Sequence, residues 1–178
     1  LEFDQIAKEL DVHFVRTGKV VVGFDDDDMK QLLKTKEQGE ANGCVGLEII
    51  NKERLLELAP NVGGEFALYS PMTGIMDPFE YTIALAENAH SNGVEYFLGD
   101  AVVDINREND LYVVKTEKNE YMTKWVINCA GLNSDKISTM LGIDEYKIYP
   151  CRGEYIIMDK MMGEYLNIPV YPVINPKI

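Results

Sequence analysis

The feature of this sequence that most constrains its fold is a nearly continuous apolar run, residues 125–130, which leads into Gly131 and then into a helix. A strand that is apolar on both sides is typical of a parallel sheet whose two faces are both covered by helices. Asn133 or Ser134 can cap the helix, which is expected to run through Leu141. The sequence therefore predicts a buried strand, a tight turn and a helix in a mixed α/β protein.

The turn between that strand and helix, Ala130-Gly131, consists of small residues and lets a ligand approach the backbone closely. A glycine at a strand end is also common as a plain connection, so cofactor contact is one of two interpretations. Neither GxGxxG nor GxxxxGK[ST] occurs, so the sequence contains no recognisable cradle for a pyrophosphate. Either the chain binds no dinucleotide, or the cradle precedes Leu1. Because the sequence begins without methionine and stops abruptly at Ile178, we expect a slice of a longer protein.

Composition excludes several classes of protein. Of the 178 residues, 46% are hydrophobic and 26% are charged, as in ordinary globular domains and unlike disordered or collagen-like chains. The formal net charge of −13 argues against nucleic acid and anionic membranes as partners, although a local basic residue can still capture a small anion. Three widely spaced cysteines and two histidines predict neither a disulfide framework nor a metal site. We expect a cytoplasmic protein with no membrane span in this segment.

The first half of the chain alternates helices with strands. The expected elements are a helix at 3–10, strands at 12–16 and 19–24, a helix from 29 onwards, a strand at 47–50 and a short helix through Leu58. Thr17-Gly18 is predicted to join the first two strands as a hairpin. The acidic run Asp25 to Asp28 lacks the ligand spacing of a calcium loop, so we expect it to cap the following helix. Asn51 is the expected cap of the short helix.

The second half contains one strong helix signal and a series of β-like runs. Asp77 is predicted to cap a helix with Pro78 at its first position and Glu80 as the reciprocal partner of a capping box, and Gly93 is the expected left-handed cap at its end. The β-like runs are 94–98, 101–106, 111–116, 120–123, 147–151, 153–158 and 169–173. Short polar connections predict that the runs between 101 and 123 form an antiparallel meander.

Arg152 is the candidate for binding a charged ligand. It lies between two β-like runs beside Gly153, where a guanidinium group could hold a carboxylate or a phosphate in a fork. The alternative is a surface ion pair with Glu154, which composition alone favours. Cys129 is expected to be a buried structural cysteine, whereas Cys151 stays open as a nucleophile because Arg152 adjoins it. Both histidines, at 13 and 90, are expected to be structural or on the surface.

Several segments resemble, in the same order, the D-amino-acid-oxidase-like family of flavoenzymes. Residues 126–135, VINCAGLNSD, resemble its VVNAAGLWSD segment with Cys129 in place of the usual first alanine, and residues 74–80, GIMDPFE, resemble its G-I-V-D-P helix entry. Residues 86–94 resemble its helix-to-strand step. Residues 150–155, PCRGEY, resemble the P-x-[RK]-G-E-Y strand of the anaerobic-type glycerol-3-phosphate and 2-hydroxyglutarate branches.

The resemblance implies an incomplete Rossmann-like FAD-binding domain interleaved with an antiparallel-sheet substrate domain. Residues 1–72 would hold the end of an FAD-domain helix and the first part of the substrate domain. Residues 73–144 would belong to the FAD domain, and residues 145–178 would form a second, truncated part of the substrate domain.

The family's site residues carry over to a few positions. The backbone of Val102 matches the position that touches the adenine, and Ala130 and Gly131 match the turn that lies against the cofactor. Arg152 and, less directly, Tyr155 match the strand that approaches the substrate side of the flavin.

The resemblance implies an FAD-dependent oxidoreductase that acts on a hydroxyl-bearing anionic small molecule. Glycerol-3-phosphate dehydrogenase is the expected activity, and L-2-hydroxyglutarate oxidase or dehydrogenase is the alternative. A separate hypothesis, drawn from the missing cradle and the large negative charge, is a standalone binding domain without catalysis. No residue has the support needed to be assigned as the general base. The 178 residues alone are expected to retain no FAD and to be inactive.

Overall fold

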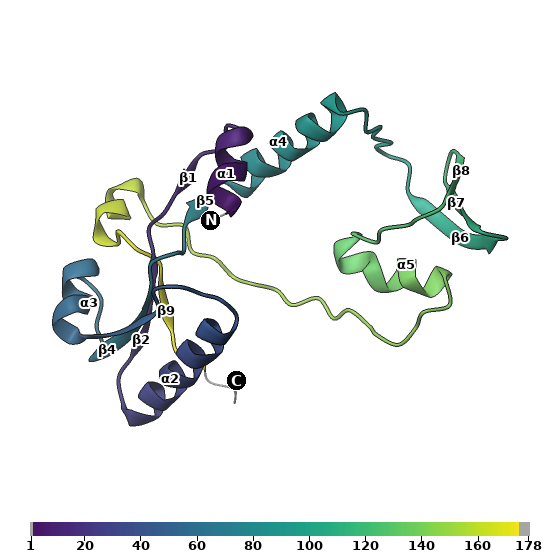
Figure 1. Ribbon diagram of the computed structural model, residues 1–178. Helices are drawn as coiled ribbons and strands as arrows, with labels where there is room; N and C mark the ends of the chain where they lie inside the picture. The colour runs from purple at the N-terminus through teal and green to yellow at the C-terminus, as the bar shows by residue number, and fades with distance from the viewer. Residues whose placement is uncertain (1, 175–178) are drawn as a thin grey trace. The chain divides into compact units, whose positions relative to one another are not determined.

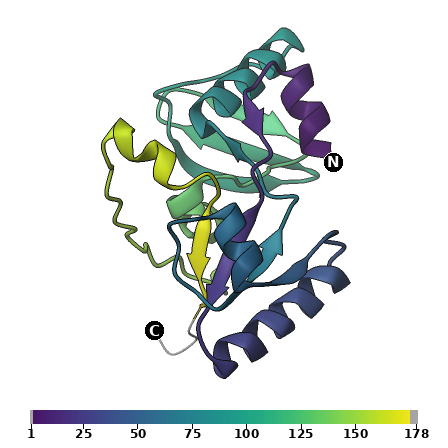
Figure 2. The same ribbon diagram turned by 90° about the vertical axis from the view of Figure 1, so that its left-hand side faces the viewer.

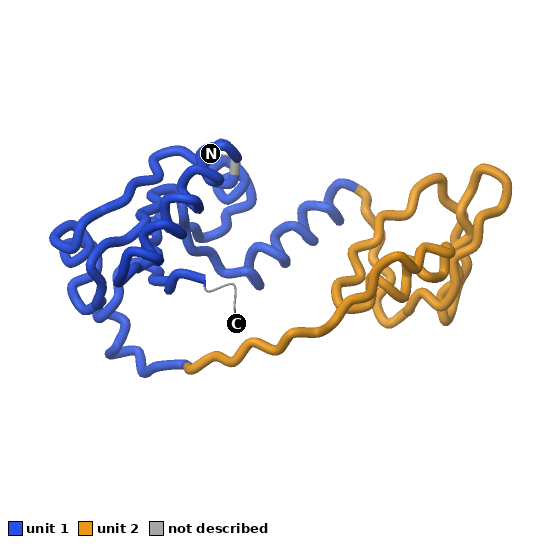
Figure 3. The backbone as a smooth tube through the Cα atoms, turned by 90° about the horizontal axis from the view of Figure 1, so that it is seen from below, with its two compact units in different colours: residues 1–92, 157–178 blue, residues 93–156 orange. Residues whose placement is uncertain are grey.

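The computed structural model describes residues 2–174, which form two compact units (Figure 3). Residues 1–92 and 157–178 belong to unit 1, and residues 93–156 belong to unit 2. Unit 2 is therefore inserted into the chain of unit 1. Helices and strands alternate along both units, so the mixed α/β class predicted from the sequence is confirmed.

Unit 1 is built on a four-stranded sheet with the strand order β3-β4-β2-β9. Its strands are β2 (Lys19–Gly23), β3 (Glu48–Asn51), β4 (Phe66–Ser70) and β9 (Val170–Pro172). The pairs β2–β4 and β3–β4 are antiparallel, whereas β9 lies parallel to β2, with Val20 opposite Val170. The three predicted runs at 19–24, 47–50 and 169–173 are therefore confirmed as strands.

Helices cover both faces of this sheet (Figure 1 and Figure 2). Val20 and Val22 of β2 share a buried cluster with Leu55 of α3 (Lys52–Leu58), whereas Val21 lines a pocket with Leu32 of α2 (Asp26–Ala41). Because successive strand residues point to opposite faces, α3 and α2 lie on opposite sides of β2. The cluster on the α3 side also contains Ile50, Ala59, Ala67 and Ile168.

Ile168 reaches that cluster just after the 3₁₀ helix η2 (Lys160–Tyr165). Asn61 Nδ2 donates a hydrogen bond of 3.1 Å to the carbonyl oxygen of Tyr165, which ties η2 to the loop after α3. The chain that returns from unit 2 is thus anchored in unit 1 by both apolar and polar contacts.

The predicted helix caps of unit 1 are confirmed. The side chain of Asp25 accepts hydrogen bonds from the backbone amides of Asp27 and Asp28, which satisfies donors that have no partner within α2. Asn51 caps α3 in the same way through Arg54 N at 3.0 Å. The tetra-aspartate run is therefore a helix start.

A second, two-stranded sheet lies beside α1 (Glu2–Glu9) and α4 (Pro78–Ser91). Its strands are β1 (Phe14–Val15) and β5 (Ile75–Met76), which pair antiparallel. The predicted hairpin across Thr17-Gly18 is wrong, because β1 pairs with β5 and β2 pairs with β4 and β9. Gly18 instead has a left-handed backbone (φ +70°), and its backbone amide donates a hydrogen bond of 2.8 Å to Thr73 O. At this point the chain passes from the two-stranded sheet to the four-stranded sheet.

Polar contacts connect the pieces around this small sheet. The guanidinium of Arg16 forms an ion pair with Asp4 of α1, donates to the carbonyl oxygen of Met72 and lies 5.2 Å from the ring centre of Phe14. Asp77 caps α4 as predicted, through Phe79 N at 2.8 Å and Glu80 N at 3.3 Å.

The predicted reciprocal bond of that capping box is replaced by a long-range one. Glu80 Oε2 accepts a 3.1 Å hydrogen bond from His13 N, which holds the start of α4 against the strand β1. Sequence spacing could not find this bond, because its partners lie far apart in the chain. The opposite end of α4 follows the prediction, with Gly93 left-handed at φ +90°.

Unit 2 contains a meander and a short helix. The strands β6 (Val102–Glu108), β7 (Leu111–Thr116) and β8 (Glu120–Thr123) pair antiparallel in sequence order, as predicted. The 3₁₀ turn η1 (Gly131–Asn133) leads into α5 (Ser134–Met140), which packs against β6. Ile105 and Val113 are buried in this sheet.

Four predicted strands do not form: the runs 94–98, 125–130, 147–151 and 153–158 have no strand in the structure. Trp125 and Ile127 are 82% and 86% exposed, and Cys129 is an exposed free thiol, so the predicted burial of this run and of Cys129 is also wrong. A parallel strand needs neighbours that supply hydrogen bonds and a cover of side chains. Within residues 2–174, no strand pairs with any of these runs.

The core of unit 1 leads to a matched pair of stability predictions on α3. Leu55 is completely buried, whereas Leu56 beside it is 41% exposed. Leu55→Ala should lower the free energy of unfolding by about 2–5 kcal/mol, because it leaves a cavity, and Leu56→Ala by about 0.5 kcal/mol. Urea unfolding of the 178-residue chain, followed by circular dichroism, measures both. Equal losses in the two variants would contradict this description of the core.

Candidate functional site

All five site residues predicted from the sequence lie in unit 2. Three of them lie in β6 or in the turn before α5. The Ala130-Gly131 turn immediately precedes α5, and Val102 is the first residue of β6, on which α5 packs. The structure therefore brings the turn and the strand that were expected to contact a cofactor into the same small assembly.

The Ala130-Gly131 turn is open to a ligand. Both residues are exposed, and Gly131 has a left-handed backbone with φ +56°. A Cβ atom at Gly131 would meet no heavy atom within 4 Å, so the space beside this backbone is free. Ala130 N donates to Asn128 Oδ1 at 3.2 Å, and Ala130 O accepts from Asn133 N at 3.0 Å. A small turn with an accessible backbone fits the close approach that a cofactor needs.

Val102 lies at the point where the meander begins. It is half-buried and pairs with Thr116 across the sheet, and the register shifts between Val102 and Asp104. Such a bulge changes the local direction of the strand and redirects neighbouring groups. Contact between this residue and a cofactor stays a prediction.

Arg152 and Tyr155 lie in the extended segment that follows α5. The side chain of Arg152 is 87% exposed, and Arg152 Nη2 is 3.7 Å from Glu154 Oε1. Among the described residues, Glu154 is the ion-pair partner of Arg152, which is the alternative considered from the sequence. At this exposure the pair is worth little, so the guanidinium could exchange Glu154 for another anion at small cost. Tyr155 is exposed, and Cys151 is an exposed free thiol.

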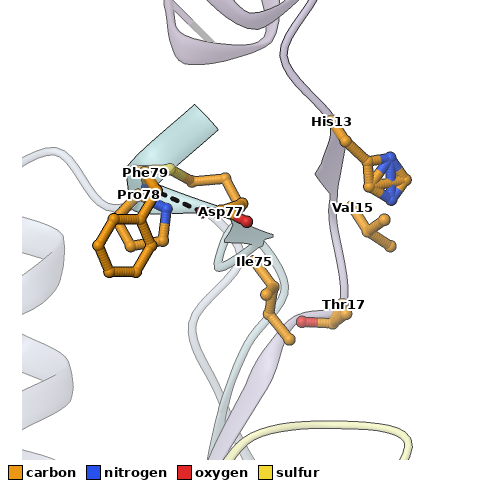
Figure 4. A pocket seen from close by; sticks show the side chains of 8 residues that line it. His13, Val15, Thr17, Ile75, Asp77, Pro78 and Phe79 are labelled. Carbon is orange, nitrogen blue, oxygen red and sulfur yellow. Dashed lines mark hydrogen bonds between the residues drawn. The ribbon is translucent and has the colours of Figure 1, made fainter. Parts of the chain in front are cut away.

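Sequence reasoning did not find a pocket in unit 1, between β1, β5 and the start of α4 (Figure 4). The pocket has a volume of about 600 Å³ and is lined mainly by apolar side chains. His13 and Thr17 come from the segment around β1, and Asp77 comes from the start of α4 (Figure 4). The Asp77 carboxylate already caps α4, so it serves the helix. Because the pairing of β1 with β5 was not predicted, no signal in the sequence could have located this pocket.

Residues 2–174 support neither a metal site nor a membrane-spanning helix. No group of three or more His, Cys, Asp or Glu side chains is arranged to hold a metal ion. No helix in this part of the chain combines the length and the apolar character that crossing a membrane requires.

Comparison with known proteins gives consistent relatives. The family described as FAD dependent oxidoreductase (DAO) matches residues 1–177. A glycerol 3-phosphate dehydrogenase from Caloramator mitchellensis is 46% identical over 173 residues, which cover 96% of this chain and 36% of that protein. An L-2-hydroxyglutarate dehydrogenase from Indibacter alkaliphilus is 33% identical over 177 residues, which cover 98% of this chain and 44% of that protein. The chain thus spans less than half the length of either relative.

Solved structures show the same fold. The L-α-glycerophosphate oxidase from Mycoplasma pneumoniae, solved with FAD bound, gives a TM-score of 0.73 at 22% identity, covering 94% of this chain and 45% of that one. The L-proline dehydrogenase from P. horikoshii also gives 0.73, at 27% identity, covering 79% and 38%. These likenesses agree with the mixed α/β architecture described above.

Proposed function

Because the chain belongs to the family of FAD-dependent oxidoreductases, we propose that it is part of a longer enzyme that oxidises glycerol 3-phosphate. The observation that carries this proposal is the 46% identity to a glycerol 3-phosphate dehydrogenase over 96% of the chain. A cytoplasmic location is part of the proposal, and the three free cysteines favour it.

The residues of unit 2 fit the cofactor of this family. FAD, when bound, supplies an acceptor for the hydride that leaves the hydroxyl-bearing carbon. Ala130 and Gly131 would let the cofactor lie against their backbone, because the space beside Gly131 is open. The backbone of Val102 would contact the adenine. Residues 73–144 are proposed to belong to the FAD domain, and residues 1–72 and 145–178 mainly to the substrate domain.

Arg152 is proposed to recognise the charge of the substrate. Its guanidinium is permanently positive, and its present partner Glu154 is itself 83% exposed, so a phosphate could replace that carboxylate. Two parallel N–H donors match a phosphate or a carboxylate and would fix the substrate's orientation. Tyr155 would stand beside it on the same segment. The chain offers no residue that we assign as the base.

L-2-hydroxyglutarate is the second candidate substrate, favoured by the 33% identity to its dehydrogenase over 98% of the chain. It shares a hydroxyl-bearing carbon and an anionic group with glycerol 3-phosphate, so Arg152 would serve either. The hypothesis of a binding domain without catalysis receives no support from these relatives, which are dehydrogenases by name.

The function is tested on the full-length protein. Purified protein should carry a flavin absorbance band, and glycerol 3-phosphate should drive reduction of an artificial dye faster than L-2-hydroxyglutarate does. A faster rate with L-2-hydroxyglutarate would exchange the two substrate assignments. Colourless protein that takes up no added FAD would overturn the oxidoreductase proposal and revive the binding-domain hypothesis.

The role of Arg152 predicts a selective loss of substrate affinity. In the full-length enzyme, Arg152→Ala should raise the KM for glycerol 3-phosphate by about 10- to 100-fold, the range expected when a charge-assisted pair is lost. Arg152→Lys should recover part of this loss, because it keeps the charge without the fork. Arg54→Ala is the control, since Arg54 also forms an exposed ion pair, with Glu57. Steady-state kinetics with unchanged FAD content would check the prediction, and an unaltered KM in Arg152→Ala would refute it.

The open space beside Gly131 predicts a selective loss of cofactor affinity. Gly142 provides a matched control, because it is also left-handed, at φ +75°, and has no heavy atom within 4 Å of its Cβ position. Alanine at either position costs about 1 kcal/mol of backbone strain. Only Gly131→Ala should also weaken FAD binding, by about tenfold if the methyl group displaces the cofactor. Fluorescence titration of the apoprotein with FAD measures the affinity of each variant. Equal FAD affinities in Gly131→Ala and Gly142→Ala would show that Gly131 is not part of the cofactor site.

A further inference from the structure

We propose that Asn128 is a positioning residue that fixes the Ala130-Gly131 turn for FAD, with α5 as its anchor. This inference rests on the proposed function, since it presumes that the turn contacts the cofactor. It assigns a role to a residue that neither the composition nor the spacing of the sequence had singled out.

The side chain of Asn128 bridges the two ends of the turn. Its Oδ1 accepts from Ala130 N at 3.2 Å, and its Nδ2 donates to Ser134 O at 2.8 Å. The same Nδ2 donates to Ser138 Oγ at 3.1 Å. The amide therefore uses its acceptor on the turn and its two donors on α5, which joins residues before and after Gly131.

The turn has few other restraints. Residues 125–130 form no strand, so no backbone ladder holds the approach to Ala130. Asn133, at the start of α5, makes no side-chain capping bond. Gly131 itself is exposed and has the conformational freedom of glycine. Under these conditions, the directional hydrogen bonds of Asn128 determine where the backbone beside Gly131 lies.

The anchor on α5 is buried and shared. Ser138 is 8% exposed, and its hydroxyl contacts Tyr146 Oη as well as Asn128. Asp135 of the same helix accepts from Ile148 N at 3.2 Å, a bond that, with others, lowers the pKa of this carboxyl. The helix thus holds the turn on one side and the start of the segment that leads to Arg152 on the other.

The test compares FAD affinity and stability in the full-length protein. Asn128→Ala should raise the Kd for FAD by about tenfold, the effect of losing one or two net hydrogen bonds. Asn128→Asp, which keeps the shape and the acceptor but loses both donors, should act in the same direction. The control is Asn106→Ala, because Asn106 is an exposed amide of unit 2 that bonds Asp104 Oδ2 at 2.6 Å. It should change the Kd by less than about twofold.

Two further measurements separate positioning from general stability. A purely structural role would lower the melting temperature of the apoprotein and leave the Kd of the folded protein unchanged. Ser138→Ala should weaken FAD binding less than Asn128→Ala does. In the double variant, the loss of FAD-binding free energy should be smaller than the sum of the two single losses, because both residues act through one contact. The visible spectrum of the FAD-saturated variants should also shift if the turn has moved against the flavin.

The outcomes distinguish this inference from the function on which it rests. If the unaltered protein binds FAD and both Asn128 variants bind it within twofold of that affinity, the positioning role is wrong and the function stands. The same follows if Asn106→Ala weakens binding as much as Asn128→Ala does. If the unaltered protein binds no FAD, the function fails first. Should Asn128→Ala not fold, the isosteric Asn128→Asp variant decides.

Discussion

The parallel pairing of β2 with β9 is the interaction on which the organisation of the chain depends. On one side β2 pairs with β4, which comes from the first half of the chain. On its other side β2 pairs with β9, which comes from the far end of the chain. Residues 93–156 lie between these two pairings in the sequence, so unit 2 leaves unit 1 after α4 and returns before η2. The cluster around Val20 and Leu55 is completed only when Ile168 arrives with the returning segment. One sheet of unit 1 therefore joins segments that precede and follow the inserted unit in the sequence.

Local signals in the sequence were reliable wherever the interaction itself is local. Asp25 and Asn51 cap their helices through amides two or three residues away, and the meander at 102–123 joins strands that are neighbours in sequence. The prediction failed where the partner is distant. Thr17-Gly18 looked like a hairpin, but the strands on either side pair with residues near 68 and 75. The helix-start carboxylate Glu80 likewise bonds His13 rather than its own cap.

The site shows the same division between local and distant information. The Ala130-Gly131 turn could be singled out from residue size and from the helix after it, and its backbone is as open as a ligand contact needs. Val102 and Tyr155 could be predicted as site residues only from the resemblance to the family. Neither a half-buried valine nor an exposed tyrosine has chemistry that marks it as a site residue by itself. Asn128 was hidden for a different reason. Its side chain matters through three hydrogen bonds whose geometry depends on the folded turn.

The unpaired run at 125–130 affects the solubility of the chain. The side chains of Trp125 and Ile127 are 82% and 86% exposed on a segment that pairs with no strand among the described residues, and an exposed, unpaired apolar segment favours association between copies. What opposes this association is mutual repulsion between copies that each carry a formal charge of −13. That repulsion fades with added salt, and it vanishes as the solution approaches the isoelectric point near pH 4.5. The solubility of these 178 residues thus depends on an unpaired apolar segment and on the charge that keeps copies apart.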